Sequence, residues 1–85
     1  MDRFSGLWVQ AMLARARKER LTTDAVYQRM EADIGHGPLA IGRTKNVLGY
    51  IDGMLSSQRG SELMRGLRVA AVGYLERERG RLKAA

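Results

Sequence analysis

The chain has 85 residues, with 15 Lys and Arg against 9 Asp and Glu, so its formal charge is +6. This length fits one small domain, and an apolar fraction of 45% is typical of a folded chain rather than a disordered one. The absence of Cys excludes disulfides, thiolate metal sites and a cysteine nucleophile, and a single histidine argues against a histidine-rich metal site. We therefore expect a small basic binding module that is not an enzyme and uses no cofactor.

The sequence shows no membrane-spanning or targeting signal. Its longest run of near-continuous apolar residues, Val69 to Val72, is far shorter than the ~20 residues needed to cross a bilayer. The first residues lack the basic start and apolar middle of a secretory signal. These features predict a cytoplasmic protein without membrane insertion. A chain this short buries only about 60% of its unfolded surface, which favours a homodimer.

Helical periodicity divides the chain into segments, of which the first spans about residues 4–20. Its apolar stripe consists of Phe4, Trp8, Met12 and the stem of Arg15. The second segment starts at a capping Thr22 or Thr23 and ends at Gly35. Its buried face consists of Val26, Met30 and Ile34.

Start signals also mark the third and fourth segments. Pro38, favoured in the first turn of a helix, begins the third. Its apolar stripe consists of Ile41, Thr44, Leu48, Ile51 and Leu55, flanked by Ala40, Val47 and Met54. Ser61 is a suitable N-cap for the fourth segment, and alternating Glu and Arg predict a frayed basic C-terminal end from about residue 77. The apolar face of the fourth segment consists of Met64, Leu67, Ala71, Tyr74, Leu75 and Leu82.

These segments predict a single all-α domain over residues 1–85, a compact bundle of about four helices. The second and third helices, joined by a short turn that contains glycine, have the layout of a helix-turn-helix pair. In the alternative, residues Leu67 to Leu75 form a strand, and the domain is a winged helix with a small β-wing after the third helix. The apolar spacing in this stretch fits a period of 3.6 better than a period of 2, which favours the helix.

Residues that could perform catalysis are sparse. The chain contains no HExxH sequence, no P-loop and no Gly-x-Ser-x-Gly elbow. Asp33 and His36 are close in sequence, and a carboxylate can orient an imidazole, but no nucleophile accompanies them. A histidine in a turn is the simpler interpretation. Asp52 either pairs with Lys45 or remains solvated.

The basic residues cluster, and such clusters attract phosphate backbones. In a helix-turn-helix unit the second helix enters the major groove by its N-terminal residues, which here include Arg43, Lys45 and Asn46, with Tyr50 one turn further. Arg can bind guanine and Asn can bind adenine through paired hydrogen bonds. Further nucleic-acid contacts are expected from Arg15, Arg17, Lys18, Arg20 and Arg59.

A series of residues in the second and third segments carries a family resemblance. They are Val26-Tyr27, Pro38-Leu39, Arg43, Val47-Leu48 and Ile51-Asp52. This series resembles the helix-turn-helix part of the winged-helix domain in archaeal origin-recognition initiators, where Val-Tyr opens one helix and Pro-Leu followed by basic residues opens the recognition helix. Leu55 stands where that family carries a glycine before its wing. The resemblance implies DNA binding through the third segment.

Two functions are consistent with these features. The first is a DNA-binding module, such as a transcriptional regulator or an accessory factor of a mobile element, that binds double-stranded DNA as a homodimer. The second is a helical protein-binding module, an inhibitor or adaptor whose positive charge steers it to an acidic or nucleic-acid-binding protein partner. Glycines recur every seven residues at Gly66, Gly73 and Gly80, opposite the apolar face, so they either pack against a second molecule or lie in solvent.

Overall fold

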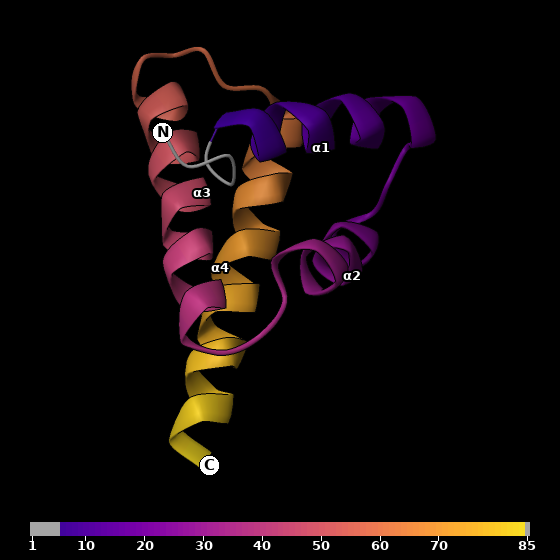
Figure 1. Cartoon of the computed structure of the whole chain (residues 1–85). Coiled ribbons are helices and arrows are strands. Elements are labelled where there is room, and N and C mark those ends of the chain that lie inside the picture. Colours follow the sequence, from indigo (N-terminus) through magenta and orange to yellow (C-terminus); the bar gives the residue numbers. More distant parts are fainter. Residues whose placement is uncertain (1–5, 85) are drawn as a thin grey trace.

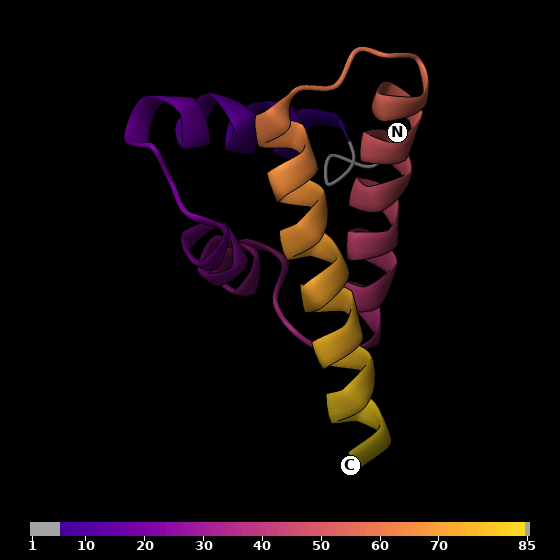
Figure 2. The same cartoon turned by 180° about the vertical axis from the view of Figure 1, so that it is seen from behind.

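The protein is described by a computed structural model that covers residues 6–84. Its helices are α1 (Gly6–Glu19), α2 (Thr23–Ile34), α3 (Pro38–Ser56) and α4 (Glu62–Ala84). Helices α3 and α4 run antiparallel side by side, α1 crosses one end of this pair, and α2 packs mainly against α4 (Figure 1 and Figure 2). The predicted all-α arrangement of four helices is confirmed. Residues 6–84 contain no strand, so the alternative with a β-wing is wrong.

Capping side chains define the starts of two helices, as the sequence predicted. Thr22 Oγ1 accepts a hydrogen bond from the Ala25 N–H at 3.1 Å, at the start of α2. Ser61 Oγ accepts one from the Met64 N–H at 3.2 Å, at the start of α4. Each hydroxyl satisfies a backbone donor that has no partner within its own helix.

A short glycine-containing turn joins α2 to α3. Gly35 and Gly37 have φ angles of 84° and 95°, a region that residues with a side chain rarely adopt. Pro38 follows in the first turn of α3, where its missing N–H costs no helical hydrogen bond. The turn therefore determines where α3 begins, which is the part of the chain that was expected to bind DNA.

The buried face of α1 is rotated from the predicted stripe. Val9, Met12 and Ala16 are buried, whereas Trp8 is half-buried at the edge of this face. Phe4, expected on the same stripe, lies outside the described residues. The rotation brings the aliphatic Val9 into the centre of the core and leaves the indole N–H of Trp8 within reach of a polar partner.

The apolar side of α3 faces the core as predicted, but the most deeply buried residues are not all the ones expected at the centre of the stripe. The fully enclosed residues are Ala40, Thr44, Val47 and Ile51. Ile41, Leu48 and Leu55, which were expected at the centre, are half-buried at the edge. All of these residues still contribute apolar contact, so the helix keeps the orientation that the periodicity indicated.

Helix α4 lies against each of the other three helices and forms the centre of the domain (Figure 1). Its buried residues are Met64, Leu67, Ala70, Ala71, Tyr74, Leu75 and Glu78. Leu82, expected on this face, is 40% exposed. The helix stays regular through Ala84, beyond the point near residue 77 where fraying was expected. Within residues 6–84, no helix has the length and apolarity that a bilayer crossing requires.

Candidate nucleic-acid interface

The first half of α3 presents a polar side to solvent. Lys45 and Asn46 are exposed there. Gly42 and Gly49 lie on the same outward side, and a Cβ added at either glycine would meet no atom within 4 Å. Thr44 instead faces the core, where its hydroxyl donates to the carbonyl one turn earlier at 2.7 Å. The outward side of α3 is therefore exposed and carries polar residues and glycines, so a large molecule can approach the helix backbone closely.

Two of the predicted contact residues connect α3 to neighbouring helices. Arg43 is half-buried, and its guanidinium donates to the Ile34 carbonyl at 3.0 Å, at the C-terminal end of α2. A cation at this end of a helix satisfies a carbonyl and interacts favourably with the helix dipole. Tyr50 is also half-buried, and its hydroxyl accepts a hydrogen bond from Gln10 Nε2 of α1 at 2.8 Å. These contacts hold α3 in place.

An open groove of about 570 Å³ lies between the start of α3 and the end of α4. Its lining residues are Ile41 from α3 and Glu76, Arg79, Gly80, Leu82 and Lys83 from α4. Lys45 follows Ile41 by four residues, so it lies one turn further on the same side of α3. Because α3 and α4 are antiparallel, Lys45 lies toward the Glu76 end of the groove, and Arg79 and Lys83 lie toward its other end. We call Arg79 and Lys83 the basic end. Arg79 and Lys83 were not among the predicted contacts, because they belong to a charged run that is typical of a solvated helix.

The remaining predicted basic residues do not join this end. Arg15, Arg17, Lys18 and Arg20 are exposed at or just after the end of α1, where Arg15 pairs with Glu19 at 2.9 Å. The end of α1 and the α3–α4 loop, which contains Arg59, lie at separate corners of the molecule, away from the start of α3 (Figure 1). The structure thus distributes the predicted cations over three places.

A buried carboxylate joins the α2–α3 turn to α4. Glu78 is only 3% exposed; its Oε2 accepts the Gly37 N–H at 3.0 Å, and its Oε1 lies 2.5 Å from His36 Nδ1. Arg81 approaches the same carboxylate at 3.6 Å. Gly37 is the N-cap of α3 and has no side chain that could accept from the first-turn amides, but its own N–H is satisfied by Glu78 of another helix. The one sequence signal for this burial is the four-residue spacing from Tyr74, which places Glu78 on the buried face.

Burial and hydrogen bonding act in opposite directions on the pKa of Glu78. Burial raises this pKa, but the hydrogen bonds from the Gly37 N–H and the imidazole, together with the nearby positive charges, bring it below the ordinary 4.5. Burial, and then the charge of Glu78, raise the pKa of Tyr74 to about 12. The Tyr74 hydroxyl donates to the Gly35 carbonyl. Near neutral pH Glu78 is therefore ionised and Tyr74 is protonated, and their hydrogen bonds hold the α2–α3 turn against α4.

Two carboxylates bind partners other than those considered from the sequence. Asp33 Oδ2 accepts hydrogen bonds from Trp8 Nε1 at 3.1 Å and from Arg29 Nε at 3.0 Å, rather than orienting the turn histidine. Asp52 pairs with Arg68 of α4 at 2.6 Å, rather than with a lysine of its own helix. Both carboxylates therefore link or stabilise helices.

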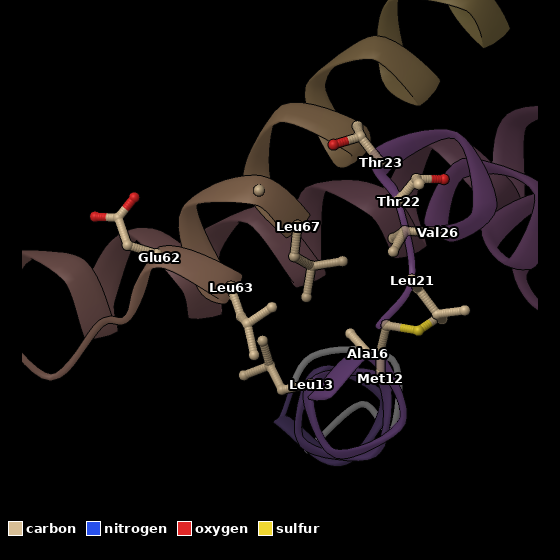
Figure 3. Close-up of a pocket in the computed structure, with 11 residues that line it drawn as sticks. Met12, Leu13, Ala16, Leu21, Thr22, Thr23, Val26, Glu62, Leu63 and Leu67 are labelled. Carbon is tan, nitrogen blue, oxygen red and sulfur yellow. The ribbon is translucent and has the colours of Figure 1, made fainter. Parts of the chain in front are cut away.

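A second, apolar pocket of about 250 Å³ lies between α1, α2 and α4. Leu13 and Leu63 approach each other across it, with Leu67 beside them (Figure 3). At its rim, Thr22 already caps α2, and Glu62 accepts a hydrogen bond from a neighbouring arginine at 2.7 Å. The pocket offers apolar contact, and residues 6–84 contain no cluster of His, Cys, Asp or Glu that could hold a metal ion.

The described chain is thus a small helical domain with a polar outward side on α3 and a basic end beside it. Its buried polar groups serve to fix the turn before α3. Compared with known proteins, the chain matches no protein-family model, no curated protein and no solved structure.

Proposed function

We propose that this chain is a DNA-binding module that contacts duplex DNA with the start of α3 and the end of α4. The observation that supports the proposal is the position of the exposed cations: Lys45 lies one turn beyond Ile41, the residue of α3 that lines the groove, and Arg79 and Lys83 line the groove from α4. Cations on two packed helices can contact separate phosphates of one duplex, and release of the condensed counterions then drives binding. The formal charge of +6 further favours a polyanionic partner.

The outward side of α3 supplies the rest of the proposed interface. Asn46 is exposed one position after Lys45, and an asparagine can bind adenine through paired hydrogen bonds in the major groove. Gly42 and Gly49 leave open space on this side, so the helix backbone can lie close to the DNA. In this proposal Lys45 and the basic end hold the DNA backbone, and Asn46 reads a base.

The proposal gives Arg43 and Tyr50 a different role from the one expected. Their hydrogen bonds to Ile34 and Gln10 fix α3 against α2 and α1, so both residues position the recognition helix. In this arrangement α2 acts as the supporting helix of a helix-turn-helix unit. A single short recognition helix makes few base contacts, so we propose that two copies bind one site with two-fold symmetry.

The test is duplex affinity, measured by fluorescence anisotropy across a salt series. Replacing Lys45 and Lys83 by Ala should weaken binding and reduce the salt slope by about 2, because two phosphate contacts are lost. The matched control replaces Arg17 and Lys18, which are exposed on α1, and removes the same charge from another corner. Equal losses in both variants would mean that net charge alone drives binding. No binding at low salt would refute the proposal.

A further inference from the structure

The groove beside the basic end has an apolar floor that DNA binding does not require. Ile41 is half-buried and Leu82 is 40% exposed, and both line the groove of about 570 Å³. Gly80 also lines the groove, and a Cβ added there would meet no atom within 4 Å. Single exposed leucines are common on protein surfaces, but apolar residues at the floor of an open groove offer a place for another apolar side chain.

The charges around this floor have a definite order. Glu76, Arg79 and Lys83 lie along one side of α4, with the carboxylate at one end of the groove and the two cations at the other. The neighbouring Arg77 lies over the Tyr27 ring, with 5.2 Å between the guanidinium carbon and the ring centroid. Arg79 and Lys83 are therefore the cations that the groove itself presents.

We propose that this groove binds an acidic amphipathic helix of a protein partner. One apolar side chain of that helix enters between Ile41 and Leu82, and its flanking carboxylates pair with Arg79 and Lys83. Glu76 disfavours an acidic residue at the other end, which gives the bound helix a preferred direction. Charge complementarity argues against a second copy as the occupant, because each copy carries a charge of +6.

The fold favours a helical partner over an extended one. Residues 6–84 contain no strand, so they offer no sheet edge to which an extended peptide could add. A helix satisfies its own backbone hydrogen bonds and presents apolar side chains at regular spacing along one side, which suits a groove between two helices.

Arg79 and Lys83 also belong to the proposed DNA interface, so the acidic helix and the duplex would compete. Only this consequence rests on the proposed DNA binding. The two ligands differ in what else they need. The helix needs the apolar floor at Leu82, whereas the duplex needs Lys45 on the outward side of α3.

The experiment uses the full chain and a synthetic acidic peptide with leucines on one helical side and glutamates beside them. A second peptide has the same composition in an order that separates the leucines. We expect the first peptide to bind, and Leu82→Ser to weaken it at least about tenfold, because one leucine contact is lost. The matched control is Leu7→Ser, since Leu7 is 72% exposed on α1. Circular dichroism shows whether both variants keep their helices.

Equal binding of the two peptides, or unchanged binding by Leu82→Ser, would overturn the proposal, because attraction would then depend on charge alone. Absence of peptide binding would overturn it as well. Duplex affinity measured on the same variants separates the two ideas. Leu82→Ser should leave it unchanged, whereas Lys45→Ala should weaken the duplex and not the peptide.

Discussion

The buried Glu78 carboxylate provides the sharpest test of how α3 is held. Glu78→Ala removes the acceptor for the Gly37 N–H, which lies 3.0 Å away, and the partner of His36 at 2.5 Å. A hydrogen bond to a charged group contributes about 1.5–3 kcal/mol, and a carboxylate at a helix N-terminus adds about 0.3–1 kcal/mol. We therefore expect the variant to lose about 2–4 kcal/mol, out of a total of roughly 4–13 kcal/mol for a chain of this length.

The assay is urea denaturation followed by circular dichroism, repeated from about pH 7 down to acid pH. Glu78→Gln is the matched control, because its amide oxygen can still accept the Gly37 N–H while the charge is absent. The pKa of Glu78 is lower in the folded protein than the ordinary 4.5. Its stabilisation is therefore complete above that value and is lost as the pH falls through the lowered pKa.

The stability gap between the wild type and Glu78→Gln should accordingly shrink on acidification. A loss below about 0.5 kcal/mol for Glu78→Ala would contradict the proposed capping of α3, since surface substitutions commonly fall within that range. A gap to Glu78→Gln that stays constant down to acid pH would contradict the role of the charge. Amide hydrogen exchange should place the increased opening in the first turn of α3.

The remaining predictions concern glycines and the single tryptophan. Gly49→Ala should raise the free energy of unfolding by up to about 1 kcal/mol, because the added methyl meets no atom within 4 Å and alanine favours a helix; an unchanged urea midpoint would count against this. Gly60→Ala should instead destabilise the protein, because its Cβ would overlap Leu55 Cδ2, and a variant as stable as the wild type would show that this leucine moves aside freely. Trp8→Phe should cost about 0.5–1.5 kcal/mol by removing the 3.1 Å hydrogen bond to Asp33, and equal stability in urea would mean that this bond contributes nothing.

Local signals in the sequence were sufficient to predict the helices. A hydroxyl at Thr22 or Ser61 acts on amides within its own first turn, and Pro38 acts on its own dihedral angle, so neighbouring residues carry the information. Periodicity likewise predicted which side of α3 is buried. It predicted the side of α1 less well, because Trp8, Val9 and Met12 leave more than one apolar direction on that helix.

The contacts around the α2–α3 turn could not be predicted in this way. Glu78 and Gly37 are 41 residues apart, and Arg43 reaches a carbonyl 9 residues earlier, in another helix. A glutamate between arginines is usually solvated, so only the packing of α4 reveals that Glu78 is buried. The basic end was missed for the same reason, since Arg79 and Lys83 come beside the start of α3 only when α4 folds back along it.

The central position of α4 has a consequence for how the domain unfolds. Because α4 packs against all three other helices, its removal would leave only the smaller contacts that α3 makes with α1 and α2. The domain should unfold in a single cooperative transition, without a populated intermediate. A protease that cuts the exposed loop before α4, at residues 57–59, would separate this helix from the rest of the backbone. The stability of the domain therefore depends on an intact loop between α3 and α4.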